Sequence, residues 1–245
     1  MIVNEIVNWD EFHLIDKVHK YRYERKFTVP SHFKLKATEQ LVRANTFLFR
    51  EVYHERRVNN IYFDTLGYND YFDNVLGVAN RKKTRIRWYG ETFGKNSSPV
   101  LEIKIKKGLI GDKWSYGLDS FELDNTFTNE CIQKVFKDAQ LPKAILESTK
   151  QLTPTLLNSY SRKYFLSADG NFRITIDFNL KYHRIDNRFN NFSFVPKYDE
   201  NIIVELKYDL NRDNEANSIT TQFPFRLNKN SKYVNGVNSF KHFPQ

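Results

Sequence analysis

Arginine, lysine and a few carboxylates recur at every second position in several segments of this chain. In residues 85–89, an extended strand places Arg85, Arg87 and Tyr89 on one face and the apolar residues between them on the other. The same alternation gives cationic positions at Arg22, Lys26, Arg85, Arg87, Lys104, Lys106, Arg162, Arg173 and Lys207, with Tyr160 beside them. Side chains of this kind bind anions, so the chemistry they suggest is recognition of a polyanion.

A linear oligophosphate suits these faces better than nucleic acid does. If the sheet that carries them closes, like charges converge and repel one another unless an anion lies among them. The planar fork of arginine binds phosphate oxygens in pairs, and lysine adds a mobile point charge. A nucleic-acid duplex cannot enter a small barrel. For any single strand, the alternative is that its polar face is the solvated outer side of an ordinary antiparallel sheet.

Acids on the same faces need a separate explanation. They are Glu24, Glu102, Asp177 and Glu205. Hard divalent cations such as Mn²⁺ and Mg²⁺ take one or two carboxylates together with phosphate oxygens of a substrate. We therefore expect a metal on Glu205 first and on Glu24 second. The alternative is that each acid pairs with a neighbouring Arg or Lys, which explains its charge without a metal.

Composition limits the class of protein. The chain has 245 residues, with 38 Lys and Arg against 29 Asp and Glu, a formal charge of +9. Cys131 is the one cysteine, so an internal disulfide framework and a thiolate zinc site are excluded, and a reducing cytoplasm is expected. The histidines show no zinc-ligand spacing, and we expect His183 at the surface. No export signal or membrane-length apolar run is visible, although a membrane-protein partner could hold the chain at a membrane.

Period-two alternation also predicts the elements that position these residues. Strands are expected at residues 21–29, 57–64, 81–89, 100–107, 113–118, 159–166, 172–180 and 202–208, and helices at 31–44, 125–139, 211–220 and 230–240. This order favours an α+β protein built on an antiparallel β-barrel, with helices packed outside it. No repeat or linker interrupts the pattern, so residues 1–245 are expected to form a single domain.

Short motifs in a fixed order add a family resemblance. They are Tyr23-Glu24-Arg25-Lys26-Phe27, Ile61-Tyr62-Phe63-Asp64-Thr65, Arg85-Ile86-Arg87-Trp88-Tyr89-Gly90, Leu101-Glu102-Ile103-Lys104, Ser161-Arg162-Lys163-Tyr164, Val204-Glu205-Leu206-Lys207-Tyr208 and Ser231-Lys232-Tyr233-Val234-Asn235-Gly236-Val237. Together they resemble the VTC (vacuolar transporter chaperone) domain, the polyphosphate polymerase branch of the triphosphate tunnel metalloenzymes. The resemblance implies a barrel that forms a tunnel, a nucleoside triphosphate such as ATP as phosphoryl donor, a growing polyphosphate chain as acceptor, and a divalent metal.

The resemblance also implies roles for particular residues. Phosphate contacts in catalysis are implied for Lys26, Arg85, Arg87, Lys104, Arg162 and Lys207, and substrate contacts for Arg173, Ser231, Lys232 and the hydroxyl of Tyr160. Metal binding is implied for Glu205. We add Arg22 and Lys106 to the substrate contacts because they share the basic faces. The pair Ser231-Lys232 opens the terminal helix, whose amide groups would add to phosphate binding at the tunnel. The alternative there is a surface helix cap with an exposed lysine.

One departure from the superfamily pattern bears on the reaction. Its hydrolases carry two glutamates ahead of a lysine on the first strand, whereas here Arg22 stands in the first glutamate's place, before Glu24 and Lys26. Fewer carboxylates make a poorer site for activating water. We therefore expect a metal-dependent phosphotransferase that extends polyphosphate. The alternatives are a metal-dependent tripolyphosphatase or nucleoside triphosphatase, and a non-catalytic module that binds polyphosphate or inositol phosphates.

Overall fold

The computed structural model describes residues 22–30, 32–107, 110–186 and 188–240. Within these residues a ten-stranded antiparallel sheet runs in the order β12-β1-β11-β9-β8-β2-β3-β5-β6, with β10 paired to β9. Its strands are β1 (Arg22–Val29), β2 (Arg50–Asp64), β3 (Asn80–Tyr89), β5 (Val100–Lys107), β6 (Ile110–Gly117), β8 (Thr153–Leu166), β9 (Arg173–Arg184), β10 (Lys197–Asp199), β11 (Ile202–Asp209) and β12 (Arg226–Leu227). A small second sheet pairs β4 (Gly94–Lys95) with β7 (Glu122–Leu123). The helices are α1 (Leu35–Arg43), α2 (Asn69–Leu76), α3 (Asn129–Asp138), α4 (Lys143–Thr149), α5 (Asp213–Thr220) and α6 (Lys232–Ser239), with a 3₁₀ turn over Leu210–Arg212.

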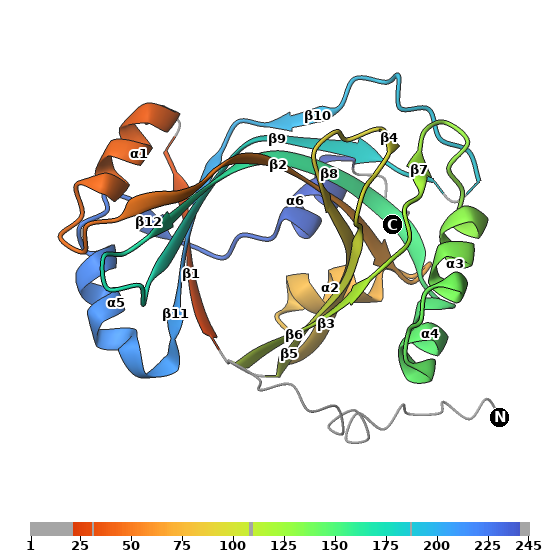
Figure 1. Cartoon of the computed structure of the whole chain (residues 1–245), viewed down its shortest axis with the longest axis horizontal. Helices are drawn as coiled ribbons and strands as arrows, with labels where there is room; N and C mark the ends of the chain where they lie inside the picture. Colours follow the sequence, from red (N-terminus) through yellow and green to blue (C-terminus); the bar gives the residue numbers. More distant parts are fainter. Residues whose placement is uncertain (1–21, 31, 108–109, 187, 241–245) are drawn as a thin grey trace.

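The large sheet curls round on itself, as Figure 1 shows. Strands β1 and β6 lie near opposite ends of the strand order, yet some of their Cα atoms come within 8 Å of each other. In the described part of the chain no ladder of hydrogen bonds joins these two strands. The predicted α+β class and antiparallel sheet are therefore confirmed. The ends of the sheet approach each other without pairing, which differs from a fully hydrogen-bonded barrel.

Two apolar clusters cover the convex side of the sheet. One joins outward side chains of β1, β9 and β11, such as Phe27 and Leu206, to helices α1 and α5. The other joins β2, β3 and β5 to α3 and α4, and contains Trp88 and Phe136. Because successive side chains of a strand point to opposite faces, these outer clusters direct the alternate, charged residues to the concave side.

Helix α6 lies inside the curve of the sheet (Figure 1). Its Tyr233 and Val237 pack with Leu156 and Tyr182 on the concave face. A Cβ atom added at Gly236 would lie 2.3 Å from Leu156 Cδ2 and 2.6 Å from Tyr182 Cδ1. Glycine at this position therefore allows the helix to approach the sheet closely.

A buried carboxylate joins β2 to two helices. Asp64 is fully buried, and its Oδ1 accepts a hydrogen bond from the backbone amide of Asp70 at 3.0 Å. Its Oδ2 accepts one from the amide of Tyr71 at 2.9 Å and one from Tyr233 Oη at 2.6 Å. Asp64 thus satisfies the first amides of α2 and fixes α6 at the same time.

Several observed elements differ from the sequence prediction at their bounds. Strand β8 begins at Thr153, earlier than expected, because its first half is buried on both faces and shows no alternation. Helix α1 begins at Leu35, and Ser31, near the expected start, lies outside the described residues. Helix α2 was not predicted, since its amides are capped from a distance by Asp64. Helix α4 was not predicted either, although Pro142 before it is a local start signal.

Candidate functional site

Most of the predicted site residues lie on the concave face of the sheet. They are Glu24 and Lys26 on β1, Arg85 and Arg87 on β3, Lys104 and Lys106 on β5, Tyr160 and Arg162 on β8, Arg173 on β9, and Glu205 and Lys207 on β11. The alternate residues of these strands fill the outer apolar clusters, so the pleat of each strand turns this set inward. The backbone of Arg22 begins β1, but its side chain lies outside the described residues.

Two glutamates from neighbouring strands come together on this face. In the β1–β11 ladder, Lys26 lies opposite Glu205 and Glu24 lies opposite Lys207. Lys26 Nζ is 2.7 Å from Glu24 Oε1, and Lys207 Nζ is 2.6 Å from Glu205 Oε1. The carboxyl of Glu24 also lies within hydrogen-bonding reach of Glu205. The structure therefore forms a carboxylate pair flanked by two ammonium groups.

Charge in this group is balanced by close contacts. Burial alone would raise the pKa of Glu205, but Lys207 and Lys26 hold it well below its usual range. Burial alone would lower the pKa of Lys26, but Glu205 and Glu24 raise it. Glu205 and Lys26 are therefore charged at neutral pH. The described residues contain no cluster of three or more His, Cys, Asp or Glu side chains that could hold a metal, so Glu24 and Glu205 would need phosphate or water oxygens to complete a coordination sphere.

Glu102 on β5 organises a second group of charges. Its Oε2 accepts hydrogen bonds from Arg85 Nε at 2.8 Å and from a terminal guanidinium nitrogen of Arg85 at 2.7 Å. Its Oε1 lies 3.3 Å from the Arg87 guanidinium and 3.0 Å from Lys113 Nζ. Although burial opposes ionisation, Arg85 and Lys113 lower the pKa of Glu102 to about 2. One carboxylate thus orients two arginines and leaves the group with a net positive charge.

Asp177 on β9 holds a third group. It is fully buried and bonds Arg162 through two hydrogen bonds of 2.5 and 2.7 Å. Lys232, the first residue of α6, donates to Asp177 Oδ2 at 2.6 Å, and its side chain is 10% exposed. The alternative of a surface cap with an exposed lysine is therefore wrong. Tyr160 contributes its ring, which lies beneath Lys232 at 4.8 Å and Arg162 at 5.3 Å.

Lys83, on the concave face of β3, has like charges nearby. Burial and the charges of Lys26, Arg81 and Arg85 lower the pKa of Lys83 to about 7. Lys83 Nζ donates to the N-cap hydroxyl of α6, Ser231 Oγ, at 2.8 Å. The structure therefore links the basic face of β3 to the start of α6.

Lys104 shows that distant strands converge. Burial is the main cause that lowers its pKa to about 7, and Arg85 and Lys207 act in the same direction. Glu24 and Glu205 oppose them. Strand β5 is far from β1 and β11 in the strand order, so these interactions act across the concave space. Lys106, farther along β5, also has a lowered pKa through burial and Arg81.

The sequence prediction left out two of these cations and left one question open. Lys83 follows the same alternation as Arg85 and Arg87, so this signal could have found it. Lys113 lies opposite Lys104 on β6, in a segment with weaker alternation. The ion-pair alternative holds for all four predicted acids, of which Glu24 and Glu205 are the two within reach of each other.

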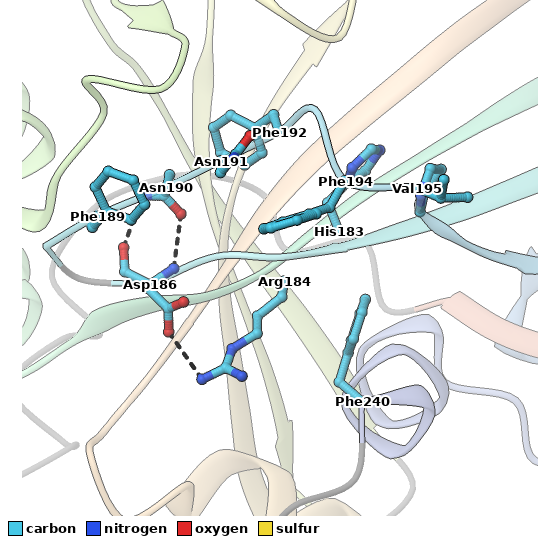
Figure 2. Close-up of a pocket in the computed structure, with 11 residues that line it drawn as sticks. His183, Arg184, Asp186, Phe189, Asn190, Asn191, Phe192, Phe194, Val195 and Phe240 are labelled. Carbon is cyan, nitrogen blue, oxygen red and sulfur yellow. Dashed lines mark hydrogen bonds and ion pairs between the residues drawn. The ribbon is translucent and has the colours of Figure 1, made fainter.

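A cavity of about 320 Å³ lies elsewhere, along the connection from β9 to β10 (Figure 2). Aromatic and aliphatic side chains dominate its lining, among them Phe192, Phe194 and Phe240. His183 is 8% exposed and packs edge-on against Phe93, so its expected surface position is wrong. Burial lowers its pKa to about 4, with a further effect of a nearby lysine. This lining does not suit a polyphosphate.

Comparison with known proteins supports the family resemblance. A model of the VTC domain family matches residues 21–241. Among solved structures, a protein named as a candidate adenylate cyclase from Vibrio parahaemolyticus is 12% identical, with a TM-score of 0.48 over 87% of this chain and 96% of that one. A protein from Pyrococcus horikoshii OT3 is also 12% identical, with a TM-score of 0.46 over 90% and 100%. Curated proteins gave no match. The likeness to these two structures is too weak to indicate a function, whereas the family match spans most of the chain.

The helices give one further observation. Among the described residues, none of them is long and apolar enough to cross a bilayer.

Proposed function

Because this chain belongs to the VTC domain family, which places it among proteins that handle polyphosphate or triphosphate, we propose that it is a polyphosphate polymerase. It would transfer the terminal phosphoryl group of a nucleoside triphosphate, with ATP as the expected donor, to a growing polyphosphate chain. The observation that carries the proposal is the convergence of cations on the concave face, where Lys83, Arg85, Lys104 and Arg162 come from three strands. A ligand with several negative charges would relieve their mutual repulsion.

Arginines on this face are oriented before any ligand binds. Glu102 fixes the guanidinium of Arg85, and Asp177 fixes that of Arg162. Donors held in place in this way stabilise developing charge without reorganising during the reaction. Lys104 and Lys83 lie among them as lysines whose charge an anion would stabilise. These residues would position the β- and γ-phosphates.

Glu205 and Glu24 fit a divalent metal that shares its coordination with the substrate. Two adjacent carboxylates supply the oxygen ligands that Mn²⁺ and Mg²⁺ prefer, and phosphate and water would supply the rest. Such a metal would neutralise negative charge on the phosphoryl oxygens. Lys26 and Lys207 already contact these carboxylates, so they would move or share them when a metal binds.

The transfer step needs no nucleophilic side chain. A terminal oxygen of the polyphosphate attacks the γ-phosphorus in line, and a new P–O bond forms. The bond from the γ-phosphorus to the oxygen bridging it to the β-phosphate breaks, and a nucleoside diphosphate leaves. Within the described ranges, no third acid joins Glu24 and Glu205, which favours this transfer over activation of water.

The test is incubation with ATP and Mn²⁺, followed by separation of products by chain length. We expect long phosphate chains from the unaltered protein. Arg87→Ala and Glu205→Gln should lower the rate by roughly 10²-fold or more, since each removes a group aimed at developing charge. Arg57→Ala and Glu147→Gln are matched controls, because both residues form exposed pairs away from the concave face.

Each outcome has a distinct meaning. Free phosphate without longer chains would show a triphosphatase and overturn the polymerase. Tight binding of tripolyphosphate with no turnover under several metals and nucleotides would show a binding module. Full activity of both site variants would overturn the site assignment.

A further inference from the structure

An exposed aromatic cluster continues the concave face beyond the phosphate-binding arginines. The guanidinium of Arg56 on β2 lies 5.0 Å from the ring centre of Tyr53, 5.6 Å from that of Tyr89 and 5.8 Å from that of Tyr164. Tyr53 and Tyr164 also meet edge to face at 5.8 Å. We name these four residues the Arg56 cluster. It combines aromatic rings with a planar cation, the two kinds of group on which nucleobases stack.

The register places this cluster next to the proposed phosphate site. Arg56 lies opposite Arg162 in the β2–β8 ladder. Tyr89 is the next inward position after Arg87 on β3, about 7 Å farther along the strand. Tyr164 follows Arg162 in the same way on β8. A ligand with phosphates on the arginines and a flat group at one end could therefore contact both sets of residues.

The cluster adjoins the start of α6, because Arg56 lies opposite Arg162 and Lys232 shares Asp177 with Arg162. Asp64, which binds α6 through Tyr233, is at the far end of β2 from Arg56, about 26 Å along the strand. A nucleobase at the Arg56 cluster would therefore lie away from the Asp64 end, where Tyr233 and Val237 of α6 pack against the sheet.

Exposure separates this cluster from an ordinary packing contact. Tyr53 is 56% exposed and Tyr89 is 45% exposed, so large aromatic surfaces remain in contact with solvent. Cation–π contacts at exposed sites stabilise a protein only weakly. Stabilisation of the paired strands β2 and β8 is therefore a poor explanation for three tyrosines around one arginine. A stacked base would cover the exposed surface.

We propose that the Arg56 cluster is the nucleobase subsite for the nucleoside triphosphate donor. The inference rests on the proposed function, because the triphosphate must lie on the neighbouring arginines. Tyr89 and Tyr53 would stack on the base, while Arg56 would stay sandwiched among the rings. Inorganic tripolyphosphate would bind the arginines without touching the cluster.

The experiment compares two ligands that share phosphates but differ in the base. Binding of ATP and of inorganic tripolyphosphate is measured by calorimetry, and quenching of 1,N⁶-ethenoadenosine triphosphate reports stacking of its base. Tyr89→Leu and Tyr53→Ala should each weaken ATP binding roughly five-fold or more and reduce the quenching. Affinity for tripolyphosphate should stay within about two-fold. Tyr198→Ala is the matched control. Tyr198 lies on β10, is exposed, and has the ammonium group of Lys181 over its ring.

Other results would overturn the inference. Equal weakening of ATP and tripolyphosphate binding in both variants would mean that the cluster only supports the fold. Unchanged ATP binding would place the base elsewhere and leave the proposed function intact. If the unaltered protein binds neither ligand, the proposed function and the subsite fall together. Thermal unfolding of each variant checks that it is folded. If Tyr89→Leu is unstable, Tyr53→Ala provides the test, because Tyr53 is an exposed residue of β2.

Discussion

Replacement of Asp177 by asparagine tests the charge balance of the concave face. The carboxylate is fully buried and is shared by Arg162 and Lys232, whose side chains are each 10% exposed. Asp177→Asn keeps the shape of the side chain but leaves two buried cations without their counter-ion. Removing one partner of a buried ion pair costs about 3–5 kcal/mol. For a chain of this size that corresponds to a fall of roughly 6–20 °C in melting temperature.

Tripolyphosphate should reverse much of this loss. An anion beside Arg162 and Lys232 would replace the missing carboxylate, so the ligand should raise the melting temperature of Asp177→Asn by more than that of the unaltered protein. Thermal unfolding by circular dichroism, with and without the ligand, measures both effects. Glu147→Gln removes the same charge from an exposed pair with Lys150 and should change stability by less than about 1 kcal/mol. If Asp177→Asn is as stable as this control, the ion-pair network described above does not hold the fold.

Two further predictions concern protons and packing. Binding of tripolyphosphate should make the protein take up protons at about pH 7 and above, because the anion raises the pKa of Lys83 and Lys104 from about 7. Binding should therefore weaken as the pH rises through this range. Calorimetry in buffers of different ionisation heat measures the uptake, and binding without uptake would contradict the assignment. Gly236→Ala should destabilise the protein by about 1–3 kcal/mol, because the added methyl group clashes with Leu156, whereas Gly117→Ala, with nothing within 4 Å of its added carbon, should unfold near the normal temperature.

Much of the fold could be predicted from the sequence because it depends on period-two alternation. The bounds of β5 agree with the expected residues 100–107, in which aliphatic and charged residues alternate from Leu101 to Lys106. The prediction was poorer where a strand is buried on both faces, as in the first half of β8. It was absent where a distant group caps a helix, as Asp64 does for α2. Closure of the sheet is a property of strands far apart in the chain, so alternation alone could not establish it.

The candidate site could also be predicted in part from the alternation. Alternation indicated which faces are charged, and the family match is consistent with the resemblance carried by the short motifs. The alternation did not indicate which acid neutralises which cation, because ion pairing depends on the register between strands. Glu102 and Asp177 emerged as counter-ions of arginines, whereas Glu24 and Glu205 came within reach of each other through the β1–β11 ladder. Lys83 would have been found by applying the alternation to the residue two positions before Arg85 on β3.

The β1–β11 ladder also bears on how the protein folds. Arg25 Nε donates to Tyr208 Oη at 2.7 Å across a sequence separation of 183 residues, and the same ladder sets Lys26 opposite Glu205. Closing so long a loop costs entropy before any contact compensates for it, and chains rich in distant contacts fold slowly. The ladder should therefore form late, after local hairpins such as β5–β6. A partly folded chain would carry basic hairpins without the carboxylate pair, so binding of the proposed metal would distinguish the finished protein from its folding intermediates.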